Sequence, residues 1–339
     1  VDEGTYTAKI TYGDVTASVE FTINHVDSDN DGYCDGCGAI YNGIGAHLAG
    51  YSVSLNGSIG VNFHMDLTQD VLDDNEAYML FTLPNGTTQK VMVSDARESA
   101  LIEEKTYYIF TCNVAAKEMT DTIQAQLITS DGSKTQVYEY SVREYADRIL
   151  SDMSGSYDDE TKELVKAMLH YGAYSQEWFD YNTTNLANEG LDILDLSGAD
   201  DWDEFNPSIS NNDKVGSFTS AYLTLESDTA INLKFKLANG VSFEDLTFVV
   251  EDTIGNVVPV TTVTTGNVCL ITLTGIKASD LDTMYNFRVT YGEDNESTIS
   301  YSAMSYARAV ANSDMDQKLK NVTAALRIFN LRANEKFEN

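Results

Sequence analysis

The sequence is poor in basic residues and contains no long hydrophobic run. Lys and Arg number 21 against 53 Asp and Glu, which gives a formal net charge of −32 at pH 7. Because a protein that binds nucleic acid needs a basic surface, this charge argues against nucleic acid and anionic membranes as partners. No run of about eighteen apolar residues occurs, so no segment is predicted to insert into a membrane. The acidic surface favours solubility and the binding of divalent cations.

Histidine is also scarce, and this limits the catalytic chemistry that the chain can support. The four histidines are His25, His47, His64 and His170. No Gly-x-Ser-x-Gly elbow, His-Glu-x-x-His helix or phosphate-binding loop accompanies them, so a hydrolase triad has no support and we predict no enzyme. A pair of glycosidase carboxylates stays open as an alternative, because any of the acidic residues could come together in space.

Cysteine is limited to four residues, which do not demand a disulfide scaffold. Cys112 and Cys269 stand alone among apolar and β-branched residues, and we expect them to be buried as small hydrophobic side chains. Cys34 and Cys37 form a Cys-x-x-Cys pair within an acidic segment.

The chain starts at Val1 and no signal peptide precedes it, so we interpret it as a processed or excised piece of a longer protein. Its length suits two or three domains. Residues 1–24 alternate apolar and polar positions on either side of Tyr12-Gly13-Asp14. This alternation predicts a two-stranded hairpin.

An internal repeat organises the rest of the chain. Tyr140-Ser141 and Tyr145-Ala146 recur as Tyr301-Ser302 and Tyr306-Ala307, and Asp121-Thr122 recurs as Asp282-Thr283. Further upstream, Leu55, Asn62 and Leu67 match Leu225, Asn232 and Leu237. The matches predict two copies of one module with the same fold. We expect Asp121 and Asp282 to cap backbone N–H groups before the strand that follows.

Each copy is predicted to contain several strands and to end in two helices. Alternating runs predict strands at 78–83, 106–114 and 123–129, with Asn85-Gly86 as a turn. Ser141 opens the first helix in a capping box with Glu144, and Ser302 opens the corresponding helix of the second copy. The second helices carry apolar residues at helical spacing: Leu164, Met168 and Tyr171, and then Leu319, Val322, Leu326 and Phe329. The predicted fold class is mainly β with α (α+β), as tandem β-sandwich modules each closed by a C-terminal helical hairpin.

The segment from His25 to Gly38 contains a candidate calcium loop. Asp27, Asp29 and Asp31 alternate ahead of Gly32, Tyr33 offers a backbone carbonyl, and Asp35 can bind directly or through water. Gly38 stands where an EF-hand has a bidentate glutamate, and no helical pattern flanks the loop. We therefore predict a weaker calcium site or one completed from elsewhere, with a solvated acidic turn as the alternative.

The same segment also offers ligands for zinc. His25, Cys34 and Cys37 supply three of the four ligands that a structural zinc site normally has, and an aspartate or water would be the fourth. In an oxidising environment the two cysteines could instead form a disulfide. Calcium is thus the predicted cofactor, and zinc is the alternative.

The segment from His25 resembles the His-x-Asp-x-Asp-x-Asp-Gly-x-Cys-Asp-x-Cys-Gly knuckle of large secreted proteins of gut-type anaerobic Firmicutes. The phrases YSVSLNGSIGVNF, FTLPNGTT, AAKEMTDTIQAQL and VKAMLHYGAYSQEWFDYNT resemble the module that often follows this knuckle. GTYTAKITYGDVTASVEFTIN resembles the last two strands of bacterial immunoglobulin-like repeats. Family members often have another cysteine two residues before the histidine, where this chain has Ile23. The resemblance implies a bacterial cell-surface location and an adhesive or scaffolding role.

These patterns predict five segments. They are the terminal strands of an immunoglobulin-like repeat at 1–24, a metal-binding knuckle at 25–38, a first module at 39–182, a linker at 183–214 and a second module at 215–339.

The expected function is binding rather than catalysis. Tyr171, Tyr174, Trp178 and Tyr181 form an aromatic stripe that could stack on sugars, although packing of the helical hairpin onto the sandwich explains it as well. We expect an extracellular monomer that recognises a host or dietary ligand, such as a glycan, mucin or a secreted immunoglobulin. A metal-stiffened spacer is the first alternative, and an accessory domain of a glycan-processing enzyme is the second.

Overall fold

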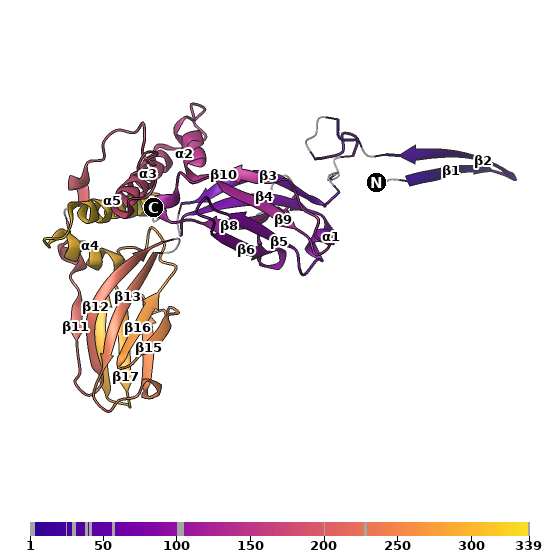
Figure 1. Cartoon of the computed structure of the whole chain (residues 1–339). Helices are drawn as coiled ribbons and strands as arrows, with labels where there is room; N and C mark the ends of the chain where they lie inside the picture. Colours follow the sequence, from indigo (N-terminus) through magenta and orange to yellow (C-terminus); the bar gives the residue numbers. More distant parts are fainter. Residues whose placement is uncertain are drawn as a thin grey trace. The chain divides into compact units, whose positions relative to one another are not determined.

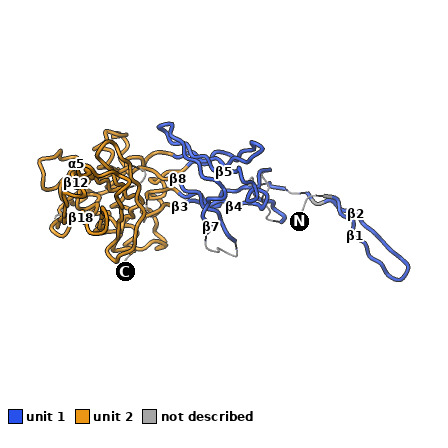
Figure 2. Tube along the Cα trace, turned by 90° about the horizontal axis from the view of Figure 1, so that it is seen from below, with its two compact units in different colours: residues 1–52, 62–112, 123–139 blue, residues 53–61, 113–122, 140–339 orange. Residues whose placement is uncertain are grey.

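The computed structural model of the chain has a mixed α+β fold with several four-stranded antiparallel sheets (Figure 1). It describes residues 4–24, 26–28, 32–37, 40, 43–55, 58–99, 105–199, 201–226 and 229–337. The chain divides into two compact units (Figure 2). Unit 1 comprises residues 1–52, 62–112 and 123–139, and unit 2 comprises residues 53–61, 113–122 and 140–339.

Unit 1 begins with the predicted hairpin, which is confirmed. Strands β1 (Gly4–Tyr12) and β2 (Val15–Ile23) pair antiparallel, and Gly13 takes the positive φ of 58° that the tight turn requires. Because side chains alternate between faces along a strand, the register places all the larger apolar residues between Tyr6 and Phe21 on one face. This face is solvent-exposed at Ile10, Tyr12 and Val15.

Two four-stranded sheets form the rest of unit 1. One has the order β3-β4-β8-β7, from β3 (Ala46–Ser54), β4 (Gly60–Leu67), β7 (Arg97–Glu98) and β8 (Tyr108–Asn113). The other has the order β10-β9-β5-β6, from β5 (Tyr78–Thr82), β6 (Thr88–Met92), β9 (Ile123–Ile128) and β10 (Tyr138–Tyr140). The ring centroids of Phe63 in β4 and Phe81 in β5 lie 5.5 Å apart, and both side chains are fully buried. The two sheets therefore share a hydrophobic core.

The local predictions for these sheets are largely confirmed. Strands β5, β8 and β9 occupy the three predicted runs. Gly86 has a φ of 83° in the turn after β5, and its N–H donates to the Leu83 carbonyl at 2.9 Å. Short helices occupy connections: α1 (Gln69–Leu72), η1 (Val93–Asp95) and η2 (Ala116–Glu118).

The long helices belong to unit 2. They are α2 (Val142–Leu150), α3 (Asp159–Phe179), α4 (Ala303–Ala311) and α5 (Gln317–Phe337), and α4 and α5 pack with α3. The Ser141 hydroxyl accepts from the Glu144 N–H at 3.1 Å, and the Ser302 hydroxyl accepts from the Ser305 N–H at 3.0 Å. Both predicted N-caps are thus confirmed. The Glu144 carboxylate accepts from the Ser141 hydroxyl at 2.9 Å, so the N-cap half of the predicted capping box is what the structure shows.

Two four-stranded sheets complete unit 2. One has the order β12-β13-β16-β15, from β12 (Gly216–Leu225), β13 (Thr229–Leu237), β15 (Thr261–Thr265) and β16 (Val268–Leu273). The other has the order β11-β18-β17-β14, from β11 (Ser208–Ser210), β14 (Leu246–Glu251), β17 (Tyr285–Tyr291) and β18 (Asn295–Tyr301). η5 (Phe243–Asp245) precedes β14. The segment that we interpreted as a linker contains η3 (Leu196–Ala199), η4 (Asp203–Phe205) and β11.

The sheets of the two halves have matching strand orders. β3-β4-β8-β7 corresponds to β12-β13-β16-β15, and β10-β9-β5 corresponds to β18-β17-β14. On the edge of β14 that does not pair with β17, a bridge joins Glu251 to Val257. In the first half, β6 pairs with β5 on the corresponding edge. The correspondence therefore extends to the edge of the second sheet.

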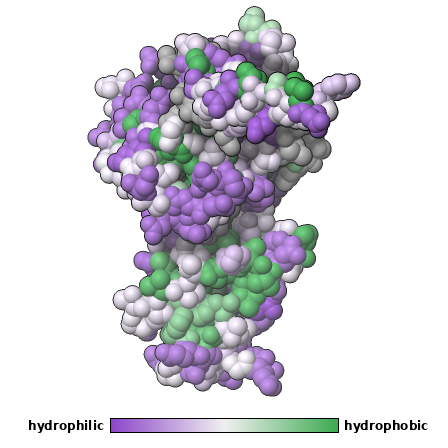
Figure 3. All heavy atoms as spheres, turned by 90° about the vertical axis from the view of Figure 1, so that its right-hand side faces the viewer, coloured by the Kyte–Doolittle hydropathy of each residue, from purple (hydrophilic) through white to green (hydrophobic). Residues whose placement is uncertain are grey.

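Hydrophobic side chains are also found on the surface. In Figure 3 they gather on the lower part of the view, where the sheets of residues 208–301 lie. Exposed large apolar residues of this region include Tyr222, Ile254, Val257 and Val263. No helix within the described residues is long and apolar enough to cross a membrane.

Candidate functional site

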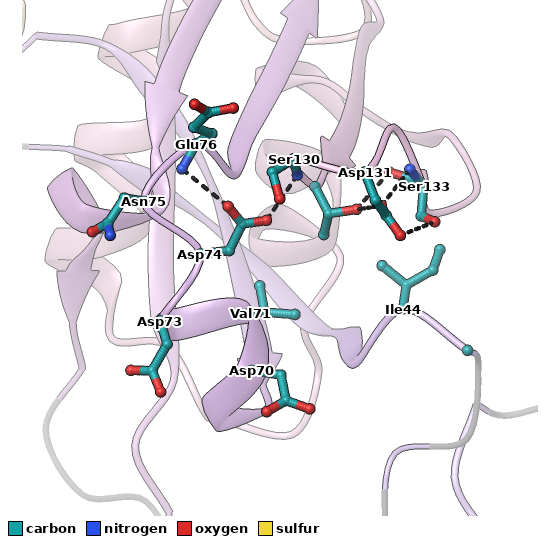
Figure 4. Close-up of a pocket in the computed structure, with 12 residues that line it drawn as sticks. Ile44, Asp70, Val71, Asp73, Asp74, Asn75, Glu76, Ser130, Asp131 and Ser133 are labelled. Carbon is teal, nitrogen blue, oxygen red and sulfur yellow. Dashed lines mark hydrogen bonds between the residues drawn. The ribbon is translucent and has the colours of Figure 1, made fainter.

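A pocket with an acidic lining lies in unit 1 (Figure 4). It has a volume of about 770 Å³ and is formed by α1 with the turn after it and by the turn after β9. Its acidic lining consists of Asp70, Asp73, Asp74, Glu76 and Asp131. We call it the acidic pocket.

Two of these carboxylates are held by the turns that carry them. Asp74 accepts from the Ser130 N–H at 2.7 Å and from the Glu76 N–H at 3.0 Å. Asp131 accepts from the Thr129 hydroxyl at 2.7 Å and from the Ser133 N–H at 2.9 Å. The backbone N–H of Ser130 lowers the pKa of Asp74, and that of Ser133 lowers the pKa of Asp131. Both groups are therefore ionised at neutral pH.

The remaining carboxylates give the pocket its capacity to accept hydrogen bonds. Asp73 accepts from the Gln69 amide at 2.8 Å, whereas Asp70 and Glu76 have no side-chain hydrogen bond within the described ranges. The arrangement suits a ligand with several hydroxyl or amine donors. Our sequence reasoning missed this pocket, although the dense acidic run at 70–76 was a visible signal.

Only part of the predicted metal-binding knuckle can be located. His25, Asp29 and Asp31 lie outside the described residues. Asp27 accepts from the Gly32 N–H at 3.0 Å, and Asp35 accepts from the Ser28 N–H at 3.1 Å. These two carboxylates therefore accept hydrogen bonds from backbone groups of their own segment. Within the described part of the chain, no group of three or more His, Cys, Asp or Glu side chains is placed to hold a metal ion.

The other predicted ligands of the knuckle differ in exposure and contacts. Cys34 is buried and Cys37 is exposed. The Tyr33 hydroxyl donates to Asp66 at 3.1 Å, and Asp66 also forms an ion pair with Lys105. The Tyr33 ring lies 4.1 Å from that of His47, between centroids. Tyr33 thus attaches the knuckle to β3 and β4.

Gly32 packs closely against the His47 ring, which Tyr33 also contacts. It has a φ of 86°, and a Cβ atom at this position would lie 2.5 Å from Cδ2 of His47. Only glycine meets both conditions, so the glycine of the Asp-Gly-Tyr sequence is required by packing as well as by the turn.

Of the four residues of the aromatic stripe, one is buried in a contact between helices and three are half-buried. Tyr171 is 3% exposed and stacks on Phe329 with ring centroids 6.0 Å apart. Tyr174, Trp178 and Tyr181 are half-buried. Tyr171 therefore stabilises the contact between α3 and α5 and is withdrawn from any ligand surface. We expected the stripe to pack the helical hairpin onto its own sandwich. The contact with α5 was not part of that expectation.

Asp121 and Asp282 accept hydrogen bonds from side chains in or next to the helices, whereas we expected them to cap the strands that follow. Asp121 accepts from the Tyr181 hydroxyl at 2.5 Å. Asp282 accepts from Asn334 at 2.9 Å and from Arg327 at 3.3 Å. We expected these carboxylates to cap backbone N–H groups; the partners found are side chains from the region of α3 and from α5. The sequence spacing could not reveal these long-range partners.

No protein-family model matches this chain, and no curated protein matches it either.

Proposed function

We propose that the chain is a non-catalytic binding fragment of an extracellular bacterial surface protein. In this proposal it consists of tandem β-sandwich modules, each closed by a C-terminal helical hairpin, behind the terminal strands of an immunoglobulin-like repeat and a metal knuckle. Its ligand is a host or dietary glycan or glycoprotein, with a secreted immunoglobulin as the protein alternative. The chain acts as a monomer.

One matched set of hydrogen bonds carries the proposal of a duplicated module. Asn62 in β4 donates to the Ser52 hydroxyl on β3 at 3.0 Å and accepts from the Thr111 hydroxyl on β8 at 2.7 Å. Asn62 is 6% exposed. A buried amide linking three strands is a demanding arrangement, because each polar atom needs a partner.

The second half contains the same arrangement. Asn232 in β13 donates to the Thr224 hydroxyl on β12 at 2.9 Å and accepts from the Thr272 hydroxyl on β16 at 2.9 Å. Asn232 is 4% exposed. Together with the matching strand orders, this agreement supports a tandem repeat. Repeated sandwich domains are common in cell-surface proteins, where loops and sheet faces bind ligands.

The acidic pocket supports a hydroxylated ligand for the first module. A sugar presents several hydroxyl donors, and ionised carboxylates accept strong hydrogen bonds from such donors. Asp70 and Glu76 stand in the pocket for this role. The net charge of −32 disfavours polyanionic ligands, so neutral glycans are preferred over sulfated or phosphorylated ones.

A glycan array probed with the intact chain tests this proposal. We expect binding to neutral mucin-type or plant glycans, together with capture of glycoproteins from intestinal secretions. Silence in both experiments would contradict the binding function and favour a spacer.

The spacer is a second candidate because two carboxylates of the knuckle accept hydrogen bonds from its backbone. Asp27 and Asp35 already accept backbone N–H groups across the turn, so a cation there would stiffen the joint between the hairpin and β3. Calcium is the proposed ion and zinc the alternative. Calorimetric titration with each ion tests this, and the absence of heat with both would contradict it.

A further inference from the structure

Unit 2 contains a cavity of about 310 Å³ between α3, α5 and the loop 190–195. The helices contribute Ala167, His170 and Ile328 among others, and the loop contributes Leu191 and Leu194. The volume lies at the lower end of the range for small-molecule sites, which suits a ligand of monosaccharide size. We call it the helix–loop cavity.

The loop that forms one wall is held in place before it reaches the cavity. Gln176, which is fully buried, accepts from the Ala187 N–H at 2.7 Å and donates to the Asn185 carbonyl at 3.0 Å. Arg143 of α2 donates to the carbonyls of Ala187 at 2.7 Å and Glu189 at 2.9 Å.

The other end of this wall is also anchored, because η3 packs on α5. Residues 190–195 therefore span two fixed points, and the cavity is formed in advance of binding. A preformed wall lowers the entropic cost of ligand binding.

His170 offers one directed hydrogen-bond donor to this cavity. The side chain is 5% exposed, and its Nδ1 lies 3.1 Å from the amide nitrogen of Asn188. Because that amide nitrogen can only donate, Nδ1 is the acceptor and the hydrogen of the neutral ring is on Nε2.

The Nε2–H group remains available. It has no hydrogen-bond partner among the described residues, and the Nε2 atom keeps some solvent-accessible surface. His170 lines the cavity, so an acceptor on a ligand bound there can reach this group. Burial, and then the charge of Lys166, lower the pKa of His170, so the ring is neutral at pH 7 and keeps this tautomer.

The rim of the cavity carries both signs of charge. Lys166 pairs with Glu163 at 2.7 Å, and Arg332 pairs with Glu335 at 2.6 Å. Asp192 and Asp195 add carboxylates from the loop. A cation or an anion would meet like charges here, whereas a neutral hydroxylated ligand can donate to the carboxylates and accept from the cations.

The interior and one edge are apolar. Ala167 and Ile328 are 3% and 7% exposed. Ile193, in the middle of the loop, is 95% exposed, although it lines the cavity. A large apolar side chain in this position can cover the apolar part of a ligand.

We propose that the helix–loop cavity binds the acetamido group of a neutral N-acetylated sugar. The acetamido carbonyl accepts from the Nε2–H of His170, and its methyl group packs against Ala167 and Ile328. The ring hydroxyls reach the charged rim, and Ile193 covers one face of the sugar. This assignment rests on the proposed glycan-binding function and names a ligand class for it.

Saturation-transfer NMR on the intact chain with N-acetylglucosamine tests the assignment. We expect the acetamido methyl protons to receive the strongest saturation, while glucose and acetate give weak signals or none. Equal signals from glucose and N-acetylglucosamine, or no signal from either sugar, would overturn the assignment.

Two variants locate the site. His170→Phe removes the donor, and Ile193→Asp removes the apolar cover at an exposed position where folding is not at risk. Each should weaken binding about tenfold or more, since one hydrogen bond or one apolar contact accounts for roughly that factor. Ile254→Asp is the matched control, because Ile254 is 82% exposed in a turn outside the cavity. Unchanged binding in Ile193→Asp would overturn the assignment even if His170→Phe failed to fold.

This experiment separates the site from the general function. If the glycan array is positive and Ile193→Asp binds the same glycans as the parent chain, the assignment fails and the proposed function stands. If the array and glycoprotein capture are both silent and N-acetylglucosamine also gives no signal, both proposals fail.

Discussion

Tyr171 of α3 and Phe329 of α5 stack on one another, with ring centroids 6.0 Å apart and planes inclined by 14°. Both helices contain 21 residues, and the spacing from Asp159 to Tyr171 equals that from Gln317 to Phe329. Equivalent positions of two matching helices therefore meet each other. In the proposed duplicated module, such pairing would follow if the two copies associate through the same surface.

Truncation of this stack should destabilise unit 2. Tyr171→Ala removes a buried ring and leaves a cavity against Phe329, so we expect a loss of about 3 kcal/mol in the free energy of unfolding. Urea denaturation followed by circular dichroism at a helical wavelength measures it. Tyr174→Ala, at a half-buried position on the same helix, should lower the free energy of unfolding clearly less. An equal loss would show that the stack stabilises the unit no more than a half-buried tyrosine does.

A close approach of α3 to its neighbours makes Gly172 sensitive to substitution. A Cβ atom there would lie 2.6 Å from Sδ of Met119 and 3.1 Å from the carbonyl oxygen of Ala116. Gly172→Ala should therefore destabilise by about 1–3 kcal/mol through overpacking. Gly198→Ala is the control, because no atom lies within 4 Å of its Cβ position. Thermal unfolding of both variants checks the difference, and equal melting temperatures would contradict it.

The matched asparagines should prove equally costly to remove. Asn62→Ala leaves the Thr111 hydroxyl without its acceptor, and Asn232→Ala does the same to Thr272. We expect each to lose about 1–3 kcal/mol of stability. Chemical denaturation of each variant measures this. A loss in one half and none in the other would argue against equivalent roles.

The buried Asp121 predicts a defined pH dependence. Burial raises the pKa of Asp121 above its ordinary value of 3.8, despite the hydrogen bond from Tyr181. The folded state therefore holds this proton more tightly than the unfolded state does. The resulting stabilisation is complete below the ordinary pKa and is lost as the pH rises through the folded pKa.

Asp121→Asn isolates this effect, since the amide oxygen still accepts from Tyr181. Relative to the parent chain, the variant should gain stability as the pH rises from about 4 to about 7. Urea denaturation at several pH values measures the difference. A constant difference across this range would contradict a raised pKa.

The knuckle predicts a metal response confined to the region before β3. A chelator should increase proteolysis within residues 25–38 while both units stay folded, because an acidic segment with little apolar surface depends on the ion for order. Asp35→Asn should weaken the calcium response more than the zinc response. Identical proteolysis with and without chelator would leave the segment an acidic turn.

The sequence predicted the local structure better than the tertiary contacts. Alternation in residues 1–24 and the Asn85-Gly86 pair specify a hairpin and a turn through short-range geometry. The serines at 141 and 302 identify helix starts, because a cap needs only residues three positions apart. These features could be predicted because their causes lie within a few residues.

Long-range partners could not be predicted in this way. Nothing near Tyr171 in the sequence indicates that it contacts Phe329, and nothing near Asp121 indicates Tyr181. The acidic pocket joins residues 70–76 to 129–133, which are distant in sequence and meet only when β5 and β9 pair. His170 likewise obtained its orientation from Asn188 in a segment that we interpreted as linker.

The central claim, that the chain binds neutral glycans, is tested most directly by a binding isotherm with an intestinal mucin. Surface plasmon resonance of the intact chain should give saturable binding to the native mucin, and enzymatic removal of its N-acetylhexosamines should abolish that binding. Binding that survives complete deglycosylation, or no binding to the native mucin, would contradict the account.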